Sequence, residues 1–161
     1  DVVDEFGNKI KFILDGGQCK IGLESTIIDL TVKPTILRPG SISAEKIQKI
    51  LKKKITINNK PKKIKGPGQL KLHYSPGIPI IMNRKYPEKN QAFISFGKKF
   101  KHGKNNFNLS KNGSLKEAAN NLYKIMRKIK KRNFKSIAVT QIPNIELGQA
   151  INDRLIKASN K

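Results

Sequence analysis

Short apolar runs dominate the first third of the chain. They are separated by the turns Asp15-Gly16-Gly17 and Lys33-Pro34, and several are rich in β-branched side chains. Such runs predict β-strands, and the two that flank Lys33-Pro34 predict a hairpin. The expected extended segments are residues 10–14 (IKFIL), 19–23 (CKIGL), 25–31 (STIIDLT) and 35–38 (TILR).

A helical pattern follows this hairpin. Ser43 is a favourable N-cap residue, and Glu45 lies in the first turn, where its charge complements the helix dipole. Ile47 and Ile50 then recur at helical spacing. The sequence therefore predicts a helix that begins after Ser43 and ends in the lysine run 52–54, which suits the negative end of a helix.

The second half of the chain alternates between the two periodicities. Ser114 and Glu117 form a capping-box pattern before a long apolar stripe made of Leu115, Ala118, Leu122, Ile125 and Ile129. The expected strands are 78–82, 91–96 and 136–141, and the expected helices are 115–131 and 147–158. Alternating strands and helices predict a small α/β unit with parallel strand pairing, and we find no internal repeat.

Residues 58–77 (NNKPKKIKGPGQLKLHYSPG) separate these two patterned regions. The stretch contains three prolines, three glycines and a charge run, and it shows no periodicity. It therefore predicts a linker. Its second half, GPGQLKLHYSP, is too specific in composition for a plain spacer.

Composition changes this picture in one respect, through charge. The 161 residues include 34 Lys and Arg against 11 Asp and Glu, which gives a net charge of +23. Such an excess is typical of nucleic-acid-binding proteins. Only five of the basic residues are Arg, however, although Arg is the residue that binds phosphate through two contacts. We therefore attribute most of the lysines to the base composition of an AT-rich genome and not to selection for nucleic-acid binding.

Compartment signals are simple. A single cysteine, Cys19, excludes an internal disulfide and favours a reducing, cytoplasmic location. No apolar run approaches the roughly 20 residues that cross a bilayer, so no membrane association is expected. The chain starts at Asp1 without an initiator Met or a signal peptide, and we expect it to be a fragment or a processed piece.

Hydroxyl, guanidinium and imidazole groups supply the candidate chemistry. Ser25 and Thr26 stand at the mouth of a strand, where they can bind a substrate or satisfy local backbone groups. Arg38 closes the neighbouring strand, which suits phosphate binding but also fits an exposed strand end. His73 and Tyr74 lie in the proline-stiffened linker, where they can serve a ligand or dock on a domain surface.

The common catalytic and metal-binding motifs are absent from the sequence. Ser25 and His73 could act as nucleophile and base, but no G-x-S-x-G elbow occurs. Cys19, His73 and His102 have no zinc-site spacing, and neither a P-loop nor G-x-G-x-x-G is present. We therefore name no catalytic residue and no metal ligand.

Three motifs together resemble one enzyme family. DGGQCKIGLESTIIDLTVKPTILRPGSIS resembles the C-terminal part of the YrdC-family domain, and GPGQLKLHYSP resembles the linker of two-domain threonylcarbamoyl-AMP synthases. IELGQAINDRLIKASNK resembles the end of the smaller C-terminal domain of these synthases. The motifs occur in family order, and the resemblance spans residues 10–161.

The resemblance implies a substrate site. The family makes threonylcarbamoyl-AMP from L-threonine, bicarbonate and ATP, with Mg²⁺ accompanying ATP, and a downstream transferase uses the product to modify tRNA. By motif, Ser25 falls where the family contacts threonine, and Arg38 falls where it contacts ATP phosphates. Tyr74 falls on the loop that folds over the nucleotide, and Thr26 and His73 are secondary candidates.

The resemblance also implies a domain plan. We expect residues 1–57 to be the C-terminal part of a YrdC-like, twisted-sheet α/β domain, 58–77 a linker loop, and 78–161 a small Rossmann-like α/β domain. The family's Lys-x-Arg and Ser-x-Asn motifs are expected upstream of Asp1, so the chain alone is expected to be inactive. The alternatives are a carbamoyl transferase that shares the YrdC-like domain, and a non-catalytic basic RNA-binding module. Double-stranded RNA binding is a further expectation. Direct tRNA contact stays open.

Overall fold

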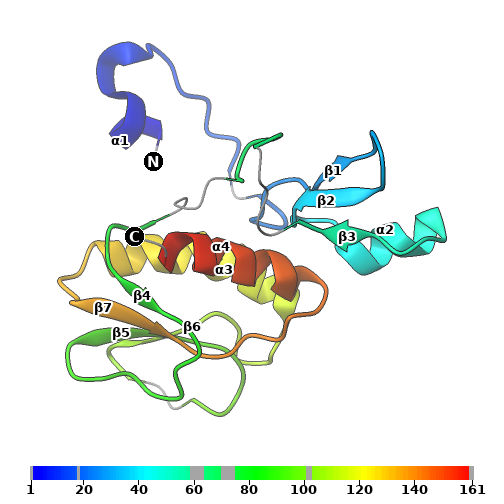
Figure 1. The fold of residues 1–161 in the computed structure, drawn as a ribbon. Coiled ribbons are helices and arrows are strands. Elements are labelled where there is room, and N and C mark those ends of the chain that lie inside the picture. Colours follow the sequence, from blue (N-terminus) through cyan, green and yellow to red (C-terminus); the bar gives the residue numbers. More distant parts are fainter. Residues whose placement is uncertain (1, 18, 59–63, 70–74, 101–102, 160–161) are drawn as a thin grey trace.

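The computed structural model describes residues 2–17, 19–58, 64–69, 75–100 and 103–159. These residues form two separate sheets with helices packed on them (Figure 1). The α/β class expected from the sequence is confirmed.

The smaller sheet contains the predicted hairpin. Its strands are β1 (Ile27–Asp29), β2 (Thr35–Arg38) and β3 (Thr56–Ile57), in the order β1-β2-β3. β1 and β2 are antiparallel, as expected for a hairpin, and β2 and β3 are parallel. Helix α2 (Ala44–Leu51) connects β2 to β3, and Ala44 and Ile47 pack against Ile36 to form a small core. The Ser43 side chain accepts from the Lys46 N–H, which confirms the predicted N-cap.

The larger sheet is wholly parallel, in the order β4-β7-β5-β6. Its strands are β4 (Ile80–Ile81), β5 (Gln91–Ser95), β6 (Asn106–Asn108) and β7 (Ser136–Val139). Every residue of β5 is buried, as is typical of a central parallel strand. The predicted parallel α/β unit is therefore confirmed.

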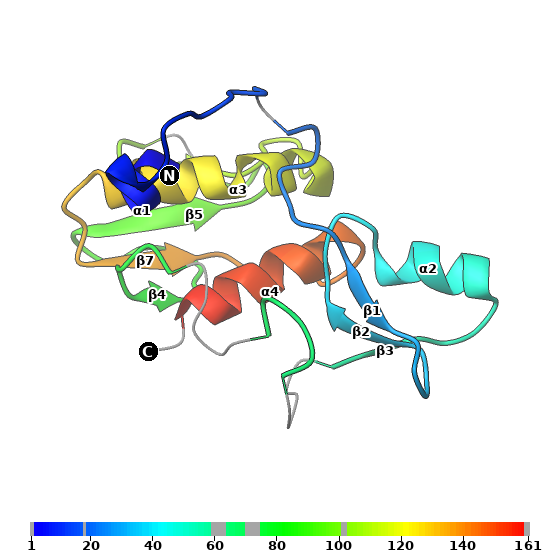
Figure 2. The same ribbon diagram turned by 90° about the horizontal axis from the view of Figure 1, so that it is seen from above.

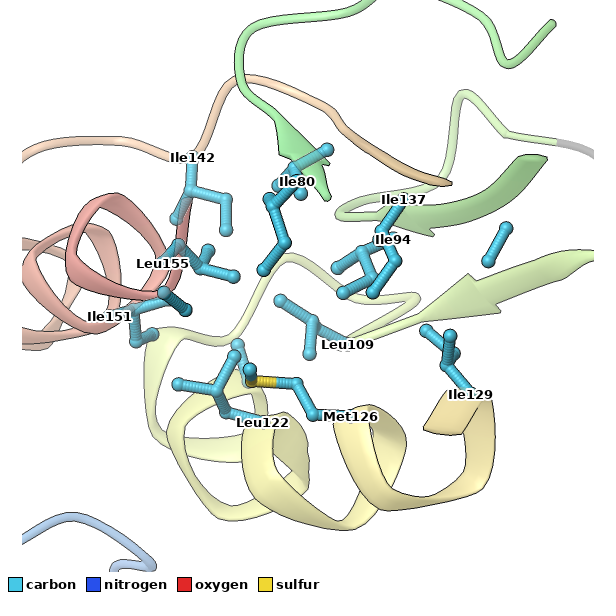
Figure 3. Close-up of a cluster of buried hydrophobic side chains, with 14 of the residues drawn as sticks. Ile80, Ile94, Leu109, Leu122, Met126, Ile129, Ile137, Ile142, Ile151 and Leu155 are labelled. Atoms are coloured by element: carbon cyan, nitrogen blue, oxygen red, sulfur yellow. The ribbon is translucent and has the colours of Figure 1, made fainter. Parts of the chain in front are cut away.

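Two helices, α3 (Leu115–Lys130) and α4 (Leu147–Ser159), cover one face of this sheet (Figure 1). Figure 3 shows their apolar side chains interleaved with those of the strands. The buried core includes Ile80, Ile94, Leu109, Leu122, Met126, Ile129, Ile137, Ile142, Ile151 and Leu155.

The N-cap of α3 is only half of the expected capping box. Ser114 accepts from the Glu117 N–H, as predicted. The Glu117 carboxylate instead accepts from the Ser110 hydroxyl, and the Ser114 N–H donates to the same hydroxyl. Ser110 therefore stands between the two groups that a full capping box would pair directly.

The strand expected at 10–14 is wrong, and residues 19–23, expected to be extended, do not form a strand either. Both segments lack strand structure, and Phe12 and Leu14 are 88% and 97% exposed. A strand needs a hydrogen-bonded neighbour, and the described part of the chain supplies none beside these residues. Helix α1 (Val2–Phe6) and a 3₁₀ turn, η1 (Gly7–Lys9), precede them and were not predicted.

The described part of the expected linker, residues 58, 64–69 and 75–77, contains no helix or strand. Gln69 organises it, because its Oε1 accepts from the backbone N–H groups of Lys65 (2.7 Å) and Gly66 (3.0 Å). None of the described helices is long and apolar enough to span a membrane. The three-part domain plan stays a prediction.

Candidate functional site

The structure brings Ser25 and Arg38 together at one end of the hairpin. Arg38 donates from Nε (3.2 Å) and Nη2 (3.0 Å) to the carbonyl oxygen of Ser25, and Nη2 also lies 3.2 Å from Ser25 Oγ. Arg38 is only 9% exposed, so its guanidinium is held in place by packing as well as by these bonds. A hydroxyl and a cation thus form a single fixed group.

Gly40 makes this contact sterically feasible. A Cβ at this position would lie 2.5 Å from each of three backbone atoms, the carbonyl oxygen of Glu24, the carbonyl carbon of Ser25 and the nitrogen of Thr26. Close by, the Ser41 N–H donates to the Glu24 carbonyl oxygen at 2.9 Å. The Pro-Gly sequence after Arg38 therefore allows the backbone after β2 to lie directly against the backbone of residues 24–26, before β1.

Thr26 serves the same backbone contact. Its Oγ1 donates to the carbonyl oxygen of Ile42 at 2.6 Å and accepts from the Ile42 N–H at 3.1 Å. Both bonds tie the start of β1 to the segment after β2. The hydroxyl of Thr26 therefore satisfies local backbone groups, whereas that of Ser25 faces the guanidinium.

The segment before Ser25 lies on the larger unit. Gly22 has a left-handed φ of +72°, and a Cβ there would lie 2.8 Å from the Asn120 Cα of α3. Leu23 packs against the core formed by α3, α4 and the larger sheet. Glycine is needed here both for its backbone conformation and for the close approach to the helix.

Glu24 continues this contact through its carboxylate. Its Oε2 accepts from Arg154 of α4 at 2.9 Å, and its Oε1 accepts from the Tyr123 hydroxyl of α3 at 2.8 Å. Partial burial alone would raise the pKa of Glu24, but the Arg154 charge, its own backbone and both hydrogen-bond donors hold that pKa below its ordinary value. Glu24 is therefore a carboxylate held at both oxygens.

Arg154 is completely buried and makes three kinds of contact. Besides Glu24, it donates from Nη2 to the carbonyl oxygen of Pro39 at 3.0 Å and from Nη1 to Asp153. Lys157 pairs with Asp153 at 2.7 Å, so two cations face two carboxylates in this cluster. Figure 2 shows α4 extending from the larger sheet towards β1 and β2. The bonds to Glu24 and Pro39 show that Arg154 reaches the end of the hairpin.

A second carboxylate joins the two units at the start of α4. Glu45 Oε1 accepts from the backbone N–H of Glu146 and from Gln149 Nε2, both at 3.2 Å. Burial alone would raise the pKa of Glu45, but hydrogen bonds from its own backbone, Ser43 and Glu146 lower it. The negative charge lies where the dipole of α4 favours it.

The linker contacts the hairpin through an ion pair. Lys65 Nζ lies 2.7 Å from Asp29 Oδ2, and this bond together with those from Thr31 lowers the pKa of Asp29 well below its usual range. The linker residues expected to contact nucleotide, His73 and Tyr74, lie outside the described residues.

Glu24, Tyr123 and Arg154 were not predicted as members of the site. Arg154 lies 130 positions from Glu24, and no periodicity links the two. One signal was available, because Arg154 is one of only five arginines and occupies a helix with an apolar pattern. Among the described residues no group of three or more His, Cys, Asp or Glu could hold a metal ion.

Two protein-family models match the chain. Residues 42–160 match the model described as threonylcarbamoyl-AMP synthase, C-terminal domain. Residues 1–40 match the Sua5/YciO/YrdC model, which is described as telomere recombination.

Curated relatives agree with these models. The chain is 31% identical to a threonylcarbamoyl-AMP synthase from Pyrococcus abyssi over 98% of its length, and 26% identical to one from Bacillus subtilis, also over 98%. It covers 52% and 51% of these two proteins, so the chain spans about half the length of the curated relatives it matches. A Schizosaccharomyces pombe relative is 36% identical over 54% of the chain and 24% of its own length.

Two solved structures are similar to the whole chain. The crystal structure of P. abyssi Sua5 complexed with L-threonine superposes on 98% of this chain and 52% of that chain, with a TM-score of 0.83 and 30% identity. A structure of a P. abyssi Sua5 variant, in which an adjacent His and Tyr are both replaced by Ala, gives a TM-score of 0.70 at 26% identity, with coverage of 98% and 49%.

Proposed function

The chain belongs to the threonylcarbamoyl-AMP synthase family, and we propose that it forms part of an enzyme that makes threonylcarbamoyl-AMP. The substrates are L-threonine, bicarbonate and ATP. In the reaction an oxygen of the threonine carbamate attacks the α-phosphorus of ATP, and pyrophosphate leaves. A downstream transferase then uses the product to modify the adenosine beside the anticodon of tRNA.

The contact between Ser25 and Arg38 carries this proposal. In it Ser25 binds threonine and Arg38 binds ATP phosphate, so two substrate-binding groups lie within hydrogen-bond distance of each other. Adenylate formation needs the carbamate and the α-phosphate in one place, because catalysis of this kind consists mostly of positioning and charge neutralisation. The L-threonine complex of the P. abyssi relative supports the assignment of an amino-acid site.

Arg38 retains a donor for phosphate. Ser25 occupies Nε and Nη2, whereas Nη1 has no partner among the described residues. Among the described residues, Gln69 Nε2 is the only fully buried side-chain nitrogen or oxygen without a partner. Since Arg38 Nη1 also has no partner there, it is not fully buried and is accessible to a ligand. A guanidinium that is held at two nitrogens and offers its third is suited to a charge-assisted bond with phosphate.

The linker contributes to the proposed site through His73 and Tyr74. This chain has one His-Tyr pair, and the relative's double variant replaces an adjacent His and Tyr. We assign Tyr74 to the loop that closes over the nucleotide, with His73 as a weaker candidate. The loop would exclude water from the carbamate and the mixed anhydride, both of which hydrolyse readily.

Further parts of the proposal concern reaction class, metal and location. The enzyme is a nucleotidyltransferase, and the present chain alone is inactive because it spans about half of its relatives. Mg²⁺ arrives with ATP, since nucleotide phosphates are its usual ligands. The protein acts in the cytoplasm, where the exposed, free Cys19 stays reduced.

The test is direct formation of the product. The complete protein that carries this chain is incubated with ATP, bicarbonate and L-threonine, and threonylcarbamoyl-AMP and pyrophosphate are measured by mass spectrometry and a coupled assay. We expect equal amounts of both, and a loss of both when threonine or bicarbonate is omitted. A Ser25→Ala variant should require more threonine. A folded complete protein that forms no threonylcarbamoyl-AMP contradicts the proposal.

A further inference from the structure

We infer that Arg154 is a positioning residue for the substrate site, which it holds from outside through the backbone next to both Ser25 and Arg38. The inference rests on the proposed function, because it assigns a purpose to the geometry of that same site. It gives the C-terminal unit a defined part in substrate binding, in addition to its own fold.

The first of the two contacts is between Arg154 and Glu24. Arg154 bonds its Oε2 at 2.9 Å, and Tyr123 bonds its Oε1 at 2.8 Å, so the carboxylate cannot rotate without losing a partner. Glu24 directly precedes Ser25 in the chain. Fixing the side chain of Glu24 therefore restricts the backbone that carries the Ser25 hydroxyl.

The second contact is between Arg154 and Pro39. The same guanidinium donates from Nη2 to the carbonyl oxygen of Pro39 at 3.0 Å, and Pro39 directly follows Arg38. One side chain thus bonds residues 24 and 39, which directly adjoin Ser25 and Arg38 at this end of the hairpin. Loss of Arg154 would release both ends of the hairpin, whereas loss of a contact to either end alone would release one.

Arg154 is itself rigid. It is fully buried, and its Nη1 donates to Asp153. Lys157 pairs with Asp153 as well, so the negative charge of that carboxylate is neutralised. Its neighbours Ile151 and Leu155 are buried in the core of the larger unit. The guanidinium therefore transmits the position of α4 to the hairpin, because neither its helix nor its side chain can move independently.

The arrangement should affect both substrates together. Threonine and ATP phosphate are bound by Ser25 and Arg38, and small displacements of such groups lower affinity and rate strongly. Glu45 provides a matched control, because it also joins the two units through α4 but contacts Glu146 and Gln149 rather than the backbone beside the site.

The experiment compares Arg154→Lys, Glu24→Gln and Glu45→Gln in the complete protein. Arg154→Lys keeps the charge but cannot bond Glu24 and Pro39 simultaneously through a planar fork. Calorimetry gives the affinities for L-threonine and for a non-hydrolysable ATP analogue, steady-state assays separate KM from kcat, and circular dichroism follows folding. We expect about tenfold weaker binding of both ligands and higher KM values in Arg154→Lys. In Glu24→Gln we expect about tenfold weaker binding of L-threonine and a smaller loss for the ATP analogue. We expect Glu45→Gln to bind both ligands as the unmodified protein does.

Every outcome decides the inference. Unchanged affinities in Arg154→Lys and Glu24→Gln overturn it, as does an equal loss in Glu45→Gln, which would indicate a general docking effect. If Arg154→Lys does not fold, Glu24→Gln decides in the same way. Failure of the proposed function is distinct, because the unmodified protein would then form no threonylcarbamoyl-AMP, and the inference would fall with it.

Discussion

Arg38 donates two hydrogen bonds to the carbonyl oxygen of Ser25, at 3.2 Å and 3.0 Å, and so connects the residues assigned to two different substrates. A change at Arg38 therefore acts at two places. It removes a cation from the proposed phosphate site, and it releases the backbone of the proposed threonine site.

Replacing Arg38 by Ala in the complete protein should lower the affinity for an ATP analogue by about ten- to hundredfold, because a charge-assisted contact contributes roughly 1.5–3 kcal/mol. Threonine affinity should fall as well, by a smaller factor, since Ser25 loses its donor. Calorimetric titration with each ligand measures both effects. Arg84→Ala, at an exposed arginine outside the hairpin, is the control. An unchanged nucleotide affinity in folded Arg38→Ala would remove Arg38 from the site.

Gly40→Ala should destabilise the hairpin by about 1–3 kcal/mol, as overpacking usually does. The added methyl would meet backbone atoms of residues 24–26 at 2.5 Å, and backbone cannot move aside as a flexible side chain can. Urea unfolding of the complete protein measures the change. Gly16→Ala, where nothing lies within 4 Å, should be nearly neutral. Equal stability of the two variants would show that the close contact is not maintained in solution.

The contact of Glu24 with Arg154 and Tyr123 should weaken in acid. The pKa of Glu24 is lower in the folded chain than its ordinary 4.5, so the unfolded chain takes up the proton first as the pH falls. The stabilisation is therefore complete above pH 4.5 and is lost as the pH drops through the depressed folded value. Arg154 also bonds Asp153, which pairs with Lys157.

Thermal unfolding of the unmodified protein and of Glu24→Gln, followed from about pH 7 to about pH 3, tests this linkage. The unmodified protein should be more stable near neutrality, and the difference should shrink below pH 4.5. Glu45 and Asp29 titrate in both proteins and cancel in the comparison. A difference that is constant across the range would show that the Glu24 charge does not contribute.

The basic end of α3 should not bind tRNA strongly. The exposed side chains there are Lys124, Arg127, Lys128, Lys130, Lys131 and Arg132. Arg132 already bonds the Lys104 carbonyl oxygen and lies over the Phe107 ring, so part of the patch has a structural purpose. Binding of tRNA to the complete protein, measured from low to physiological salt, should be little affected by charge reversal of the lysines. A steep salt dependence that disappears on reversal would favour an RNA-binding surface.

The linker loop at His73-Tyr74 should act as a lid. In the complete protein, Tyr74→Ala and a Gly/Ser segment in place of residues 67–76 should both abolish product formation while the protein stays folded by circular dichroism. Protease cleavage in the loop of the unmodified enzyme should slow when ATP and threonine are added, because closure protects the backbone. Full activity with the Gly/Ser segment would show that the loop is only a tether.

Local patterns predicted the parts of the candidate site that are close in sequence. The hairpin, its turn and the helix after Ser43 follow from β-branched runs, a proline and an N-cap, all of which act over a few residues. Ser25 and Arg38 could be selected because each stands at a strand end. Their direct contact could not, because it depends on how closely Gly40 lies against residues 24–26.

Contacts between segments that are distant in the sequence could not be predicted from such local patterns. The motif that contains Arg154 resembled a family signature, but its physical reason, a partner at Glu24, appears only when both units are folded. The short strands β3 and β6 were missed, since two or three residues are too few to show a period. Residues 10–14 show the opposite error, in which an apolar run is no strand without a neighbour.

The 130-residue separation between Glu24 and Arg154 has a consequence for how the protein is made. During synthesis the hairpin leaves the ribosome long before α4, the last of the described helices, exists. Until then the Pro39 carbonyl and the Glu24 Oε2 lack their partner Arg154, and contacts over such separations form slowly. The hairpin should therefore reach its final geometry only after the C-terminal helix has docked, which makes a chain truncated before residue 154 a poor candidate for ligand binding.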